Sequence, residues 1–140
     1  MLSENTLSKL YEMRLNSMAQ SFRDQMTDTA YVSMQFEERF GLLVDSEWNK
    51  RRTNRLKLLI KKAEYAYAQA CIEDINYAPE RHLDKGQITR LSLCGYIQDC
   101  NNVIILGATG TGKSYLGCAL GVAANRNFYS TRYIRLPDLF

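Results

Sequence analysis

The chain has 140 residues, of which 46% are hydrophobic and 24% charged, and its net charge is +3 at pH 7. This composition is typical of an ordinary globular protein, and no run of residues approaches the roughly 18 consecutive apolar residues of a membrane span. The first residues also lack the basic and apolar regions of a secretory signal. We therefore expect a cytoplasmic protein with no membrane partner.

Cysteine usage agrees with this expectation. Cys71, Cys94, Cys100 and Cys118 show no Cys-x-x-Cys spacing, and His82 is the only histidine. Zinc sites need two closely spaced pairs of ligands, and disulfide frameworks belong to secreted proteins. The sequence predicts four reduced, buried thiols and no zinc site.

Residues 1–70 are expected to form a helical bundle that binds DNA or a partner. A first helix, ending at the Thr27-Asp28-Thr29 cluster, has apolar residues at helical spacing: Leu7, Tyr11, Met18 and Phe22. A second helix begins near Ser33 and carries apolar residues on one face: Phe36, Phe40, Leu43, Val44 and Trp48. The pattern continues to Tyr67, with or without a break near Thr53. We expect Phe36 and Trp48 in the core of this bundle.

Charge is distributed unevenly along these helices. Residues 1–47 hold eight acidic and four basic side chains, whereas residues 48–62 hold no acidic and seven basic ones. The run is either a solvated helix face or a surface that contacts the phosphates of DNA. Its seven members are Lys50, Arg51, Arg52, Arg55, Lys57, Lys61 and Lys62.

Residues 71–100 are expected to form a linker and a short helix. The segment from Asp74 to Pro79 has no helical period, and a residue that precedes proline avoids the helical conformation. A short helix is expected from Leu83 to Leu93, ended by Gly95.

Residues 101–140 change in character. Val103-Ile104-Ile105-Leu106 is an apolar, β-branched run typical of a buried parallel strand. A glycine-rich turn and a helix from Lys113 to Asn125 follow it. We therefore predict an α/β fold, in which the helical bundle precedes the first, incomplete part of a parallel sheet, truncated at its C-terminal side.

The glycine-rich turn matches the P-loop pattern G-x-x-x-x-G-K-[ST] at every position. In this motif glycines let successive N–H groups surround a phosphate, the lysine reaches the β- and γ-phosphates, and the hydroxyl of Ser114 can bind Mg²⁺. The predicted cofactors are ATP and Mg²⁺. We assign the nucleotide contacts to Gly107, Ala108, Thr109, Gly110, Thr111, Gly112, Lys113, Ser114 and Tyr115.

Hydrolysis needs more than a P-loop. It also requires a carboxylate, usually at the end of an apolar strand, that holds Mg²⁺ and orders the attacking water. No such segment follows Ser114, since Arg135 and Pro137 interrupt the only candidate, which ends at Asp138. These 140 residues are predicted not to hydrolyse ATP.

Three stretches resemble the IstB-like ATP-binding proteins, which are transposition helpers of bacterial insertion sequences and relatives of DnaC-type helicase loaders in the AAA+ class. The resemblance implies that the predicted sheet is the beginning of a P-loop NTPase sheet of the AAA+ type. They are the segment from Gln35 to Trp48 (QFEERFGLLVDSEW), the basic segment from Asn49 to Leu56, and the segment from Leu83 through the P-loop. Ala108 stands where proline is frequent in that family, and the usual glycine after the P-loop helix is missing from residues 125–129.

The resemblance implies an ATP-binding transposition helper that binds duplex DNA non-specifically, assembles with copies of itself when complete, and assists a transposase. Two alternatives stay open: a DnaC-like helicase loader, and a non-enzymatic DNA- or partner-binding remnant that carries only the beginning of a P-loop domain. A small P-loop kinase is disfavoured, because such enzymes usually begin with the P-loop.

Overall fold

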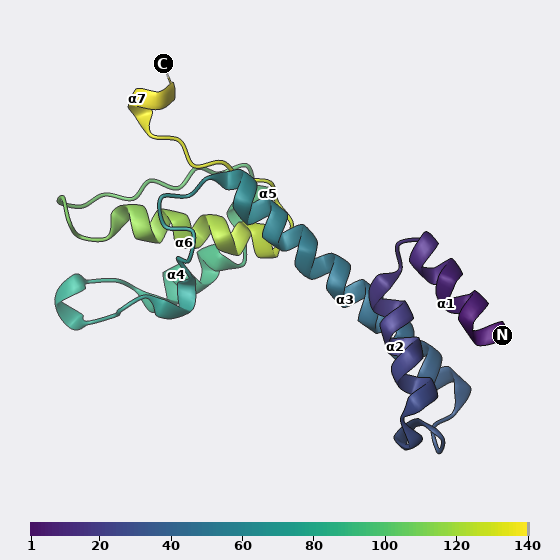
Figure 1. Cartoon of the computed structure of the whole chain (residues 1–140). Helices are drawn as coiled ribbons and strands as arrows, with labels where there is room; N and C mark the ends of the chain where they lie inside the picture. Colours follow the sequence, from purple (N-terminus) through teal and green to yellow (C-terminus); the bar gives the residue numbers. More distant parts are fainter. Residues whose placement is uncertain (140) are drawn as a thin grey trace. The chain divides into compact units, whose positions relative to one another are not determined.

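A computed structural model describes residues 1–139 of the chain (Figure 1). It consists of two compact units, Met1–Arg55 and Leu56–Phe140. Every regular element in the described residues is an α-helix or a short 3₁₀-helix. None of these helices is long and apolar enough to cross a membrane.

The first unit contains α1 (Leu2–Glu12), α2 (Asn16–Thr27), the 3₁₀-helix η1 (Thr29–Tyr31) and the beginning of α3 (Phe36–Ala63). The sequence predicted one helix over the region of α1 and α2. The structure instead breaks it at residues 13–15, where Arg14 adopts the left-handed conformation with φ 61°. The two resulting helices pack against each other, and Leu7 and Ala19 are their buried residues.

Hydrogen bonds connect α3 to the helices before it. The Ser46 hydroxyl donates to the Ser17 carbonyl over 3.2 Å, and Gln25 Nε2 donates to the Arg39 carbonyl over 2.9 Å. The apolar face that was expected in the bundle core is largely exposed. Phe36 is 68% and Trp48 56% exposed, so the expectation that these two residues form a core is wrong for this unit.

The second unit contains the end of α3 and then η2 (Ile72–Asp74), η3 (Pro79–Arg81), α4 (Lys85–Ser92), α5 (Gly95–Gln98), α6 (Lys113–Arg126) and α7 (Leu136–Leu139). The Asp84 side chain accepts a hydrogen bond from the Gly86 N–H over 2.9 Å and so caps α4. The predicted short helix is therefore present, two residues later than expected at its start. Gly95 does not end it, since Cys94 takes the left-handed turn with φ 65°.

Helix α6 forms the centre of the second unit. Seven consecutive or nearly consecutive positions of this helix are buried, and the small side chains of Cys118 and Ala119 pack against Ala70. Helix α4 and η2 pack against it as well. The predicted helix from Lys113 to Asn125 is confirmed within one residue at its C-terminal end. Phe128 follows the helix with φ 64°, so a phenylalanine occupies the left-handed position that commonly belongs to glycine.

The predicted parallel sheet is wrong for this structure. No strand occurs among residues 1–139, and the described fold is entirely helical. Residues Val103 to Leu106 have no regular structure, and Ile104 and Leu106 are 80% and 88% exposed. A strand exists only when a neighbouring strand accepts and donates its backbone hydrogen bonds, and no described segment forms such a ladder with this run.

The cysteines divide into two groups. All four thiols are free, but only Cys94 and Cys118 are buried, whereas Cys71 is half-buried and Cys100 exposed. The expectation of four buried thiols is therefore wrong for two of them.

Candidate nucleotide-binding site

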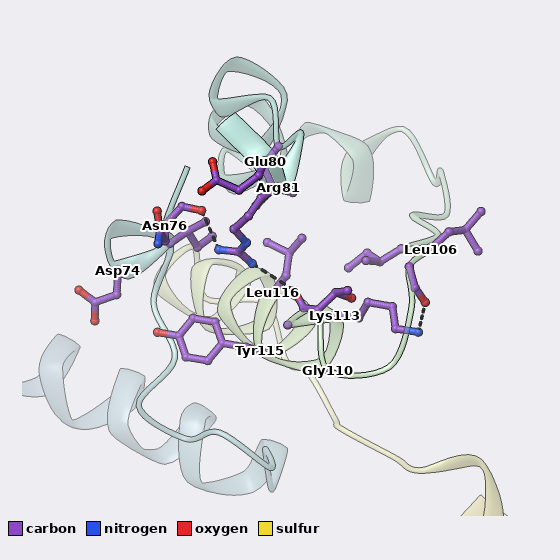
Figure 2. A pocket seen from close by; sticks show the side chains of 15 residues that line it. Asp74, Asn76, Glu80, Arg81, Leu106, Gly110, Lys113, Tyr115 and Leu116 are labelled. Atoms are coloured by element: carbon purple, nitrogen blue, oxygen red, sulfur yellow. Dashed lines mark hydrogen bonds between the residues drawn. The ribbon is translucent and has the colours of Figure 1, made fainter. Parts of the chain in front are cut away.

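A cavity of about 750 Å³ lies within the second unit, between the segment that contains η2 and η3 and the glycine-rich turn that precedes α6 (Figure 2). Its volume lies within the range of cavities that hold small molecules, roughly 300–1,000 Å³. The first segment contributes Asp74, Ile75, Asn76, Glu80, Arg81 and Leu83; the second contributes Ile105, Leu106, Gly107, Gly110, Thr111, Gly112, Lys113, Tyr115 and Leu116.

The N-terminus of α6 gives this cavity a favourable environment for anions. Gly112 is the N-cap, with φ 91°, and no side chain caps the helix. Gly110 also has a positive φ of 81°, which side-chain-bearing residues rarely adopt. Among the described residues, none accepts a hydrogen bond from the backbone N–H groups of residues 108–115. Such a helix end, with unpaired N–H groups and a positive dipole, attracts anions.

Side chains of the turn hold it in shape. Lys113 Nζ donates to the Gly107 carbonyl over 2.5 Å, and the Thr111 hydroxyl donates to the Ala108 carbonyl over 2.6 Å. A Cβ atom on Gly107 would lie 3.0 Å from the Thr111 Oγ1 atom, a closer approach than most Cβ contacts. A side chain at 107 would therefore press against Thr111, and glycine suits this compact turn.

The structure adds Arg81, which the sequence analysis did not single out. Its guanidinium donates from Nη1 to the Asn76 carbonyl over 2.6 Å and from Nη2 to the Thr111 carbonyl over 3.2 Å. Figure 2 shows the side chain reaching from η3 towards the glycine-rich turn. No spacing rule connects residue 81 with the turn, because the connection depends on how the chain folds back between them.

Two carboxylates line the same cavity, and both precede the turn in the chain. Asp74 lies on the opposite side of the cavity from Lys113 (Figure 2). Its Oδ2 atom accepts a hydrogen bond from Cys71 Sγ over 2.9 Å, and this bond raises the pKa of the Cys71 thiol above its ordinary value. Glu80 is the second carboxylate. Neither carboxylate was predicted from the sequence, because a magnesium-binding carboxylate was expected after the P-loop.

A metal ion would find few ligands here. Among residues 1–139 no group of three or more His, Cys, Asp or Glu side chains could hold one. Ser114, the predicted Mg²⁺ ligand, is exposed and does not line the cavity. Mg²⁺ keeps several waters and is usually held by one or two protein groups together with substrate phosphates. One serine hydroxyl is therefore enough to serve as the protein ligand of a magnesium–nucleotide complex.

Six of the nine predicted nucleotide residues line the cavity: Gly107, Gly110, Thr111, Gly112, Lys113 and Tyr115. Ala108, Thr109 and Ser114 do not. The Tyr115 hydroxyl accepts a hydrogen bond from the Cys71 N–H over 3.5 Å, and its ring meets that of Tyr67 edge to face, with centroids 5.8 Å apart. Tyr115 therefore forms an aromatic wall that is fixed by its neighbours.

The predicted DNA-contacting residues all lie on α3 and all are exposed. Lys50, Arg51, Arg52 and Arg55 belong to the first unit, and Lys57, Lys61 and Lys62 to the second. Arg51 and Arg52 lie close to other side chains of the same helix. Arg51 Nε lies 3.4 Å from Glu47 Oε2, and the Arg52 guanidinium lies over the Trp48 ring, 4.9 Å from its centroid.

Known proteins resemble this chain over nearly its whole length. The family model of the IstB-like ATP binding protein matches residues 8–140. The predicted ATP-binding protein of insertion sequence IS1162 from Pseudomonas fluorescens is 41% identical over 99% of this chain, which spans 60% of that relative's length. The predicted insertion sequence ATP-binding protein y4pL from Sinorhizobium fredii (strain NBRC 101917 / NGR234) is 36% identical over the full chain, which spans 57% of it. The chain therefore belongs to the family of IstB-like ATP-binding proteins.

Proposed function

We propose that this chain binds ATP in the cavity before α6 and serves the transposition of an insertion sequence. The observation that carries the proposal is the uncapped N-terminus of α6, whose unpaired N–H groups lie beside Lys113 in a cavity large enough for a nucleotide. The family and the names of its relatives point to the same ligand and the same kind of genetic element.

The two sides of the cavity suit different parts of ATP. The turn from Gly107 to Lys113 supplies N–H groups, a helix dipole and an ammonium group, which together match the charge of the phosphates. Ile75, Tyr115 and Leu116 supply apolar and aromatic surface that a purine base can contact. We assign the phosphates to the turn and the base to this apolar surface.

Mg²⁺ enters this proposal only as part of the nucleotide complex. Most of its ligands would be phosphate oxygens and waters, and Ser114 is the protein hydroxyl nearest in sequence to the phosphate-binding lysine. The absence of ATP turnover in these 140 residues stays a prediction.

Titration calorimetry with ATP on the 140-residue chain tests the site. Lys113→Ala removes the ammonium group that reaches the phosphates, and we expect it to lower the affinity at least roughly ten- to hundredfold, the scale of a lost charge-assisted hydrogen bond. Lys62→Ala, which removes an exposed lysine of the same unit outside the cavity, serves as the control. Unchanged affinity in Lys113→Ala would place the nucleotide elsewhere.

We propose further that the chain binds duplex DNA without sequence preference and that the complete protein assists a transposase. Seven exposed basic side chains on α3 support the DNA contact, because phosphate neutralisation by lysine and arginine is independent of base sequence. The assignment of the relatives to insertion sequences supports the transposase.

A further inference from the structure

Arg81 and Lys113 form an unusual pair within the second unit. Both line the cavity, and both donate to backbone carbonyls of the glycine-rich turn: Lys113 to Gly107, and Arg81 to Thr111. Neither forms an ion pair with a carboxylate in the described residues. Two other arginines of this unit behave differently, since Arg126 pairs with Glu73 at 2.8 Å and Arg132 with Glu64 at 3.7 Å.

The Arg81 guanidinium lies at the positively polarised end of α6. Arg81 Nη2 lies 3.1 Å from the point where a Cβ atom on Gly112 would stand, and Gly112 is the N-cap of α6. The N-terminus of a helix carries about half a positive charge, which repels cations and attracts anions. Lys113, the first residue of α6, adds a full positive charge at the same helix end.

Arg81 also keeps hydrogen-bonding capacity for a ligand. A guanidinium has five N–H donors, and within the described residues two of these donate, to Asn76 and Thr111. The remaining three have no acceptor there. The two carbonyl contacts hold the guanidinium at the edge of the turn. Its remaining N–H donors suit the oxygens of a phosphate, which arginine binds with two parallel hydrogen bonds.

We infer that Arg81 is a second phosphate-binding cation of this site, supplied by the segment before the glycine-rich turn. Its ligand is the polyphosphate chain of a nucleoside di- or triphosphate. This inference rests on the proposed ATP site, and it adds to that site a contact from outside the P-loop motif. Asp74 and Glu80 also line the cavity, and in Figure 2 both carboxylates point away from Lys113.

The inference predicts a graded loss of affinity. In Arg81→Ala we expect ATP to bind roughly ten- to hundredfold more weakly, because charge-assisted hydrogen bonds disappear. AMP, whose single phosphate leaves most of the polyphosphate contacts unmade, should lose much less. Arg81→Lys keeps the charge without the fork and should fall between the wild type and Arg81→Ala. Arg132→Ala removes an exposed, paired arginine of the same unit and should leave the affinity for each nucleotide unchanged.

Titration calorimetry with ATP, ADP and AMP on the four chains and on Lys113→Ala decides the matter. An equal loss for ATP and AMP in Arg81→Ala, with no recovery in Arg81→Lys, would make Arg81 a structural strut and overturn the inference. Full ATP affinity in Arg81→Ala alongside a loss in Lys113→Ala would overturn the inference alone. Full affinity in Lys113→Ala, or no ATP binding by the wild type, would overturn the proposed site and this contact with it.

Discussion

At the scale of single residues, a cluster of hydrogen-bonded side chains lies at the C-terminal end of α6. Asn125 is completely buried; its Nδ2 donates to the Tyr129 carbonyl over 3.0 Å and to Thr131 Oγ1 over 3.1 Å. Its Oδ1 atom accepts from the Tyr65 hydroxyl over 2.6 Å, and the hydroxyls of Tyr65 and Thr131 are hydrogen-bonded to each other. The Tyr65 hydroxyl, the Asn125 amide and the Thr131 hydroxyl can therefore form a closed ring of three hydrogen bonds. In this ring each group donates one bond and accepts one, so these polar atoms have partners without water.

The Tyr65 ring also restricts α6. A Cβ atom on Gly121 would lie 2.7 Å from the ring, closer than real Cβ atoms approach other atoms. Glycine at 121 therefore lets the aromatic ring contact the helix backbone directly. The polar ring of hydrogen bonds and the close contact together fix the chain after α3 against the helix that carries the candidate site.

Tyr65→Phe tests this group and carries a pH dependence. At pH 7 we expect it to lower the free energy of unfolding by about 1–3 kcal/mol, because Asn125 and Thr131 lose a buried partner. Burial raises the pKa of Tyr65 above its ordinary value. A raised pKa in the folded state gives stability that is present below the ordinary pKa, near 10, and lost as the pH rises further.

The difference between the wild type and Tyr65→Phe should therefore shrink above about pH 10. Urea unfolding at pH 7 and at several values above 10 measures it. Tyr67→Phe is the matched control, since the Tyr67 side chain is half exposed and its hydroxyl has no hydrogen bond within the described residues. Equal stability of Tyr65→Phe and the wild type at pH 7 would contradict the stabilising role given to the hydrogen bonds of the Tyr65 hydroxyl.

At the scale of elements, the apolar run before the glycine-rich turn distinguishes the structure from the sequence prediction. A buried strand would lose about 2–5 kcal/mol on an Ile→Ala substitution. Because Ile104 is 80% exposed, we expect Ile104→Ala to change the free energy of unfolding by less than about 0.5 kcal/mol. Ile88→Ala, at a position of α4 that is 4% exposed, is the matched control and should show the large loss.

Urea unfolding of both variants provides the measurement. A loss in Ile104→Ala as large as that in Ile88→Ala would mean that the run is buried in solution, contrary to the structure.

The helices were easier to predict than the rest for a physical reason. A helix makes its backbone hydrogen bonds within four residues, so the spacing of apolar residues predicted α6 closely. The run from Val103 to Leu106 shows the opposite case, because a strand depends on a partner that local residues do not specify. The helix break at Arg14 was not predicted, because the apolar spacing continues across it. Only the left-handed backbone conformation of Arg14 reveals the break.

The candidate site shows the same limit. The P-loop pattern located the turn and Lys113, because their spacing is local to eight residues. Arg81 and the two cavity carboxylates lie about 30 residues earlier. Only the return of the chain from η2 and η3 to the N-terminus of α6 brings them to the same cavity.

At the scale of the whole molecule, the basic residues of α3 are shared between the two units. We expect non-specific DNA binding to weaken roughly 10³- to 10⁵-fold between 50 and 200 mM salt if six or more phosphates are contacted. Glutamine at Lys50, Arg51, Arg52 and Arg55 tests the first unit, and glutamine at Lys57, Lys61 and Lys62 tests the second. Each lost phosphate contact should reduce the slope of log affinity against log salt by about 1.

Fluorescence anisotropy with two duplexes of unrelated sequence measures these slopes. Lys9→Gln with Arg23→Gln removes two positive charges from α1 and α2 and serves as the control for net charge. A slope that neither set of glutamines changes would leave the basic run as a solvated helix face.

The hydrogen bonds of Lys113 and Thr111 within the glycine-rich turn have a consequence for how fast a nucleotide can be captured. Both side chains are already held by carbonyls of the turn before any ligand arrives, so little rotamer freedom remains to be lost on binding. Lys113 must, however, release the Gly107 carbonyl to reach a phosphate, and the enthalpy gained is therefore a difference between two hydrogen bonds. A turn whose backbone is already shaped favours capture by collision followed only by movement of the Lys113 side chain, and it leaves discrimination between nucleotides to their rate of release.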